Sequence, residues 1–261
     1  MTAEDSMTLL DSILLFFAAL AAGGLNSVAG GGTFFSFPAL IFSGVPPIPA
    51  NATSTVALWP GTLASSWAYR RRLPRSVMIF LPLMLASIGG GYFGAHLLLR
   101  TPPRIFMRLI PFLFLGGTLL FAFGKKLVRG AARTDHHGNA SWAALAGVTV
   151  AQFFIAVYGG FFGGGIGILM LASFTFLPLS DIHAMNGLKT LLASTINVVA
   201  IVTFIVAKIV FWPEAVLMLF GAALGGYAGA HFAQKVNPAR VRTFVVCVGF
   251  AMSFYFLYRY H

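Results

Sequence analysis

Apolar residues run along this chain in long stretches that are interrupted by glycine, proline and short groups of charges. Most of these stretches hold about 20 residues, which is the length that an α-helix needs to cross a bilayer core of roughly 30 Å. The pattern predicts an all-α polytopic membrane protein. The expected segments cover residues 9–29, 33–42, 50–69, 77–99, 103–123, 142–158, 166–177, 182–211, 213–233 and 238–258.

Composition supports the same class. Hydrophobic residues make up 58% of the 261 residues and charged residues only 9%, whereas a soluble domain is about 25% charged. The net charge of +11 would suggest a nucleic-acid partner in a soluble protein. Here most Lys and Arg residues lie in short loops, where they orient a membrane protein. We therefore expect a multi-pass protein of the cell inner membrane whose partner is the lipid bilayer, with no nucleic-acid partner.

Two of the expected segments are too short to cross a membrane. Residues 33–42 and 166–177 each follow a glycine triplet, at residues 30–32 and 163–165 respectively. Ten helical residues rise only about 15 Å, half of the hydrocarbon core. The freed backbone groups of a broken helix cannot be left in lipid, so they must line a cavity or be buried in protein. Paired short segments in two halves of a chain are typical of transporter sites.

The second half of the chain repeats the first. GGYFGAH at residues 90–96 matches GGYAGAH at residues 225–231, an offset of 135. The same offset aligns Asn51 with Asn186 and Thr55 with Thr190, and the glycine triplets align with an offset of 133. So much identity indicates a duplicated unit. We divide the chain into a first membrane repeat (residues 1–123), a polar linker (124–141) and a second membrane repeat (142–261).

The number of crossings per half decides how the two repeats are oriented. If each half crosses the membrane an odd number of times, the two halves have inverted orientations. Five crossings meet this condition, and so do three crossings with the first two segments folded as a re-entrant hairpin. Four crossings give parallel halves. Odd crossings place 11 Lys and Arg residues on one side and 5 on the other, whereas even crossings place 10 and 6. The positive-inside rule therefore favours inverted repeats with the N-terminus outside.

Several features point to a binding site for an anion. Helix N-termini carry partial positive charge and free N–H groups. Helices should begin after both triplets and again near Ala50 and Ile182, so four N-termini could meet at one small anion. Asn and Thr at i, i+4 share a helix face in both repeats. The predicted substrate-binding residues are Gly30, Gly31, Gly32, Asn51, Thr55, Gly163, Gly164, Gly165, Asn186, Lys189 and Thr190.

Lys189 is the strongest single indication of a site. A charge at membrane depth costs roughly 2.5 kcal/mol or more, so such a residue usually has a function. Its ammonium could neutralise the anion, or it could snorkel to the interface and only orient its helix. The glycines could instead serve close helix packing. The threonine hydroxyls could bond to their own helix backbone.

Other chemistries lack the residues that they need. All six acidic residues lie at or near segment ends, so we expect no carboxylate relay for protons or sodium within the membrane. Cys247 is the only cysteine, which excludes a disulfide or a thiol pair within one chain. We predict no metal site, no cofactor and no enzymatic activity.

A glycine-rich broken segment precedes ANATST (residues 50–55) in one half and MNGLKT (residues 185–190) in the other. With these motifs the chain resembles the sulfite exporter TauE/SafE family (TSUP) over nearly its whole length. The resemblance implies a secondary carrier of small sulfur-containing anions or organic acids.

The leading hypothesis is an exporter of a small sulfur-containing oxyanion or organosulfonate, such as sulfite or sulfoacetate, that works by alternating access. The alternatives are an importer of a small organic acid, an anion channel and, least favoured, a membrane redox-assembly protein. The sequence does not fix the oligomeric state, and a homodimer stays open.

Overall fold

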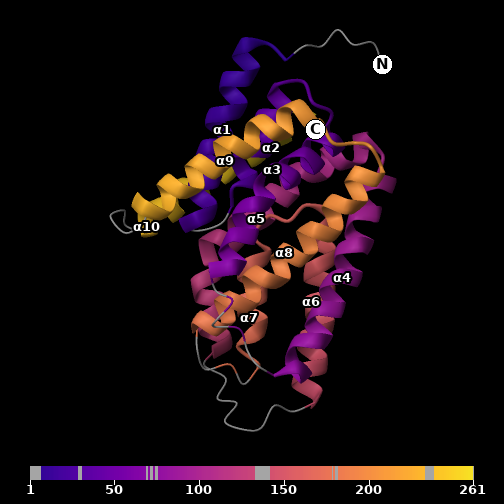
Figure 1. The fold of residues 1–261 in the computed structure, drawn as a ribbon, viewed down its shortest axis with the longest axis vertical. Coiled ribbons are helices and arrows are strands. Elements are labelled where there is room, and N and C mark those ends of the chain that lie inside the picture. The colour runs from indigo at the N-terminus through magenta and orange to yellow at the C-terminus, as the bar shows by residue number, and fades with distance from the viewer. Residues whose placement is uncertain are drawn as a thin grey trace.

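The computed structural model describes residues 7–28, 31–68, 70, 73, 76–132, 142–177, 179, 182–232 and 238–260. Within these ranges the chain forms ten α-helices and no strand, which confirms the predicted all-α class (Figure 1). The helices are α1 (Leu9–Val28), α2 (Thr33–Phe42), α3 (Pro47–Ala68), α4 (Val77–Arg100), α5 (Pro103–Ala132), α6 (Trp142–Phe161), α7 (Ile166–Phe174), α8 (Ile182–Val206), α9 (Trp212–Phe232) and α10 (Pro238–Tyr260).

The outer surface of the helices is apolar. Five of the described helices (α1, α4, α5, α6 and α8) are long and apolar enough to cross a membrane. Large side chains point outward from several helices, including Phe17 (61% exposed), Phe154 (65%) and Tyr227 (81%). Soluble proteins rarely expose apolar surface so continuously. The protein is therefore a multi-pass membrane protein, as predicted.

The boundary between the first repeat and the linker differs from the prediction. The linker was expected to begin at residue 124, but α5 continues as a helix to Ala132. The sequence GKKLVRGAA at residues 124–132 contains Lys, Leu, Arg and Ala, which are strong helix formers, and no proline. Of the predicted linker, residues 133–141 lie outside the described residues.

Several other helix ends also differ, and two of them have a clear local cause. Helix α3 begins at Pro47 instead of residue 50, because proline is well tolerated in the first turn of a helix. Helix α8 ends at Val206 instead of residue 211. There Lys208 adopts φ +56°, and the Lys208 and Ile209 amides donate to the carbonyls of Ile205 and Phe204. This is a Schellman motif, which ends the helix with a left-handed residue.

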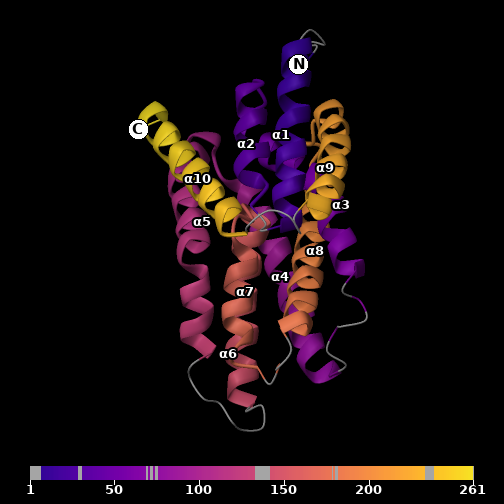
Figure 2. The same cartoon turned by 90° about the vertical axis from the view of Figure 1, so that its left-hand side faces the viewer.

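The helices pack in a pattern that is unchanged when the two halves are exchanged. Helix α1 packs along α9, and its counterpart α6 packs along α4. Two further pairs, α3 with α8 and α5 with α10, each join a helix to its own counterpart. Figure 2 shows α1 beginning at the end of the molecule where N is marked, while α6 begins near the opposite end.

Glycines allow the closest of these contacts. A Cβ atom on Gly94 of α4 would overlap the carbonyl oxygen of Val157 on α6, and one on Gly90 would lie 2.5 Å from the carbonyl oxygen of Phe153. In the equivalent α1–α9 pair, a Cβ atom on Gly225 would overlap the carbonyl oxygen of Leu20. Small residues at these positions let the backbones approach, as in other membrane helix pairs.

The inverted arrangement of the repeats stays a prediction that topology mapping can test. We expect reporter proteins fused after Arg75 and after Arg242 to read as cytoplasmic, because these arginine-rich loops should share one side of the membrane. Opposite locations for the two reporters would contradict inversion and favour parallel halves.

Candidate functional site

Both short helices begin where the glycine triplets predict. Helix α2 begins at Thr33 and α7 at Ile166, immediately after the triplets. Gly31, Gly163 and Gly165 adopt φ angles of +89°, +84° and +82°, a region that other residues rarely visit. The triplets therefore turn the chain between a long and a short helix. Gly30 lies outside the described residues.

The structure brings the two triplets together against one face of α5. A Cβ atom on Gly31 would lie 3.0 Å from Cζ of Phe121. A Cβ atom on Gly117, one helical turn earlier in α5, would lie 2.9 Å from Cζ of Phe34 and 3.5 Å from the carbonyl oxygen of Gly164. The two breaks thus lie close to each other in the interior.

Aromatic rings pack closely around α2. Phe37 is fully buried and packs edge-on against Phe162, with ring centroids 6.2 Å apart. Phe34 packs edge-on against Phe114 at 5.1 Å. This packing buries the α2 side of the break in protein, where its backbone groups do not contact lipid.

The predicted meeting of four helix starts reduces to two. Helix α3 begins at Pro47, beyond the far end of α2, and the ten residues of α2 span about 15 Å. In the same way α8 begins beyond the far end of α7. The starts of α2 and α7 directly follow the glycine triplets, whereas the second turn of α3 reaches the second break through the bond from Asn51 to the carbonyl of Phe161.

At the first break, one backbone donor is already used. The Gly32 amide donates to Oδ1 of Asn26 at 2.8 Å. A Cβ atom on Gly32 would lie 2.7 Å from the carbonyl oxygen of Ala22, so only glycine fits. The sequence analysis did not select Asn26, although a polar residue near the end of an apolar helix and just before a triplet was a usable signal.

At the second break, the backbone donors are open. The amides of Gly164, Gly165, Ile166 and Gly167 donate no hydrogen bond within the described part of the chain. The hydroxyl of Tyr158 donates to the carbonyl of Gly164 at 2.8 Å and fixes the turn. Helix starts with free amides attract anions.

Lys189 lies beside this helix start. Its aliphatic chain covers Gly167, where a Cβ atom would lie 3.2 Å from Cδ of Lys189. Its ammonium donates to Oδ1 of Asn186 at 3.0 Å. Within the described residues it forms no ion pair with a carboxylate; Asp11 bonds to Thr8, and Glu214 lies in the first turn of α9. A cation that has no counter-charge in the described part of the chain and lies next to a positive helix end favours an anion at this position.

In the first repeat, the residue equivalent to Lys189 contacts its short helix through a hydroxyl. Ser54 aligns with Lys189 at the offset of 135. The Ser54 and Ser36 hydroxyls lie 2.6 Å apart, and Ser36 also donates to the carbonyl of Gly32. Each long helix is therefore tied to its short helix at this position, but only the second repeat places a charge there.

The paired amides and hydroxyls have different surroundings. Asn51 is 2% exposed, its Nδ2 donates to the carbonyl of Phe161 at 3.1 Å, and its Oδ1 has no hydrogen-bond partner among the residues that the structure describes. The Thr55 hydroxyl donates to the carbonyl of Asn51 at 2.8 Å, and the Thr190 hydroxyl donates to the carbonyls of Asn186 and Gly187 at 3.0 Å. In this arrangement both threonine hydroxyls already donate to backbone carbonyls, so neither can donate a hydrogen bond to an anion.

The structure also contains an apolar groove of about 520 Å³, which shares Tyr158 with the second break. It opens between α5, α6 and α7, and Tyr158 supplies its main polar side chain. The remaining lining residues are Phe112, Leu113, Gly116, Leu119, Leu120, Phe123, Gly124 and Leu169. An unpaired small anion gains nothing from such a lining, so the candidate site is the Lys189 region.

Long apolar helices, two broken helices in corresponding positions and an interior cluster of polar groups define a membrane transporter. The comparisons agree with this class. The chain belongs to the sulfite exporter TauE/SafE family, which matches residues 15–256. The predicted resemblance is therefore confirmed.

Relatives of this chain cover almost its whole length. A "Probable membrane transporter protein" of Haemophilus influenzae is 28% identical over 92% of this chain and 92% of its own. "Probable membrane transporter protein ORF9" of Sinorhizobium sp. is 27% identical over 92% of this chain and 89% of its own. "Probable membrane transporter protein YfcA" of Escherichia coli K12 is 27% identical over 95% and 90%. No solved structure matches the chain.

Proposed function

We propose that this transporter carries a small sulfur-containing oxyanion or organosulfonate, such as sulfite or sulfoacetate, out across the cell inner membrane by alternating access. The observation that carries the proposal is Lys189 against the first turn of α7. A charged group, open backbone amides and the absence of a described carboxylate partner at one place suit a small anion.

The residues at this place would share the binding of the anion. The amides of Gly165, Ile166 and Gly167 would donate to its oxygens, and the Lys189 ammonium would neutralise its charge. Oδ1 of Asn186 accepts a hydrogen bond from the ammonium and holds it beside the helix start. Because an unpaired buried charge is costly, the anion-bound state should be the more stable one.

A thermal-shift panel on the purified protein tests the proposal. Sulfite, sulfate, sulfoacetate, acetate and lactate are compared with taurine and a neutral sugar as solutes without net charge. A ligand at 100 times its Kd should add about 2.7 kcal/mol to the free energy of unfolding. Stabilisation by neutral solutes and by none of the anions would contradict the proposal, and stabilisation by lactate or acetate alone would favour an organic acid.

A further inference from the structure

Two matching rows of polar side chains lie on α3 and α8. In both helices the spacing of four, four and three residues places the row on one helix face. The α3 row consists of Asn51, Thr55, Trp59 and Thr62, and its counterparts at the offset of 135 form the α8 row of Asn186, Thr190, Ser194 and Asn197.

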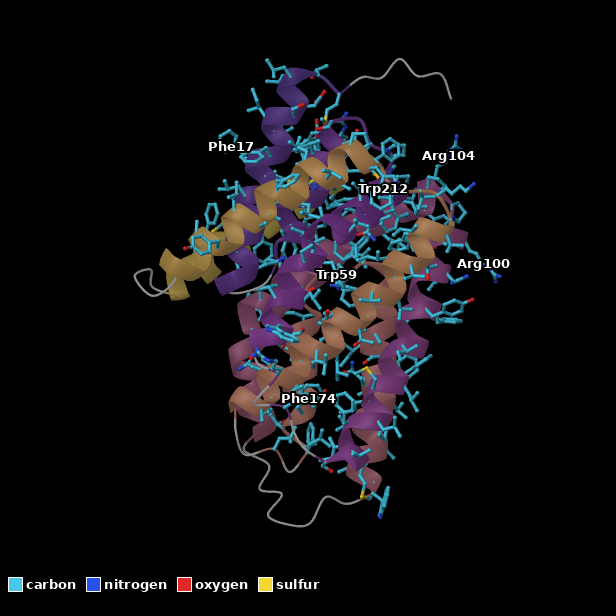
Figure 3. The ribbon with its side chains drawn as sticks, viewed as in Figure 1. Phe17, Trp59, Arg100, Arg104, Phe174 and Trp212 are labelled. Atoms are coloured by element: carbon cyan, nitrogen blue, oxygen red, sulfur yellow. The ribbon has the colours of Figure 1, made fainter. Side chains whose placement is uncertain are left out.

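The two rows meet at equivalent residues. Nε1 of Trp59 donates to Oγ of Ser194 at 3.3 Å. A residue can touch its own counterpart only where an axis that relates the two halves passes between them. Figure 3 shows Trp59 midway along the molecule, whereas Arg100 and Arg104 point outward at its edge. The Trp59 side chain is half-buried.

Because α3 and α8 run in opposite directions, the rows extend to opposite sides of this contact (Figures 1 and 2). Asn51 precedes Trp59 by eight residues, and Asn186 precedes Ser194 by eight. Each interval corresponds to about 12 Å of helix. The two asparagines therefore lie on opposite sides of this contact, and the rows form a single polar file with Trp59 and Ser194 at its centre.

We propose that the indole N–H of Trp59 and the hydroxyl of Ser194 bind the transported anion at the centre of this file. The inference rests on the proposed function, because it locates a second binding position for the same anion. Both groups are neutral donors, which suit an oxyanion that must also leave. Lys189 is not a member of the α8 row, but its ammonium donates to Asn186, the first residue of that row. It lies five residues before Ser194, about 7.5 Å along the helix, so the charged position adjoins one end of the α8 row.

The contact in the present structure is one that an anion can replace. Ser194 is 4% exposed, and its hydroxyl donates to no described residue, whereas Thr190 and Thr195 each donate to the carbonyl four residues back. The bond from Trp59 is long for an N–H donor. An anion oxygen would accept a hydrogen bond from the indole N–H in place of Ser194. It would accept a second hydrogen bond from the serine hydroxyl. The bond between Trp59 and Ser194 joins the two rows at the centre of the file.

The chain offers a direct probe of this position. Its other tryptophans are Trp67, Trp142 and Trp212, which are 68%, 72% and 50% exposed. Replacing these three by phenylalanine leaves Trp59 as the only tryptophan. In detergent, sodium sulfoacetate and sodium sulfite should each change the emission of Trp59 saturably, with half-saturation at the concentration that half-saturates transport in liposomes. Sodium chloride at equal ionic strength should not.

Two single substitutions complete the experiment. Trp59→Phe keeps an aromatic ring without the N–H, and Ser194→Ala keeps the helix. Each should raise the KM for sulfoacetate at least tenfold, because each removes a hydrogen bond to a charged group. Trp67→Phe, on the exposed face of the same helix, should leave the KM unchanged. If the wild type transports the anion while Trp59 emission and both KM values stay constant, the inference is wrong and the proposed function stands. If the wild type transports no anion, both are wrong.

Discussion

Replacing Lys189 by alanine is expected to abolish anion-induced stabilisation and to reduce transport in liposomes to the background rate. The ammonium supplies the only charge described at the start of α7, beside Gly167 and Asn186. A hydrogen bond to a charged partner contributes about 1.5–3 kcal/mol, which corresponds to a roughly ten- to hundredfold loss of affinity. Thermal shift and flux are measured on the same preparation, and unfolding without ligand shows whether folding is retained.

Matched variants separate the loss of charge at the site from the loss of charge in general. Lys189→Arg keeps the charge but not the shape of the ammonium, and should keep part of both activities. Arg100→Ala removes an exposed cation at the end of α4 and should leave both unchanged. If Lys189→Ala transports like the wild type, Lys189 only anchors α8 at the interface, and binding must depend on backbone amides.

Replacing Gly94 or Gly225 by valine is expected to destabilise the protein more than any other glycine substitution discussed here. In both cases even a Cβ atom would overlap a backbone carbonyl oxygen of the neighbouring helix, and backbone cannot move aside as a side chain can. Overpacking typically costs about 1–3 kcal/mol or more, so the melting temperature should fall by roughly 5–10 °C.

Gly116→Ala is the matched control, since no atom lies within 4 Å of the position that its Cβ would take. Alanine is also the better helix former by about 1 kcal/mol, so this variant should be as stable as the wild type or slightly more so. Equal stability of Gly94→Val and the wild type would contradict the close packing of α4 against α6.

The fold was predictable from the sequence because its main rules are local. Apolar length predicts the spans, the glycine triplets predict the start of both short helices, and the GGYFGAH and GGYAGAH motifs reveal the duplication. The errors lie where local rules compete. Helix formers after residue 124 extend α5, and Lys208 in the left-handed region ends α8 early.

The candidate site was less predictable because its geometry depends on contacts between the repeats. The sequence predicted Asn51 and Asn186 in one site, and this stays a prediction. It gave no sign that Asn26 would use the Gly32 amide or that Trp59 would meet its own counterpart Ser194. Asn51 and Lys189 were selected as polar residues in apolar segments, and their partners could be identified only from the structure.

The measurement that tests the central claim most directly is counterflow in liposomes that contain the purified protein. Vesicles are loaded with unlabelled sulfoacetate, and labelled sulfoacetate is added outside at a low concentration. A carrier that works by alternating access should accumulate the label transiently and saturably, and unlabelled sulfite outside should compete. Entry of label that is unaffected by internal sulfoacetate would indicate a channel, and no entry of any sulfur-containing anion would contradict the account.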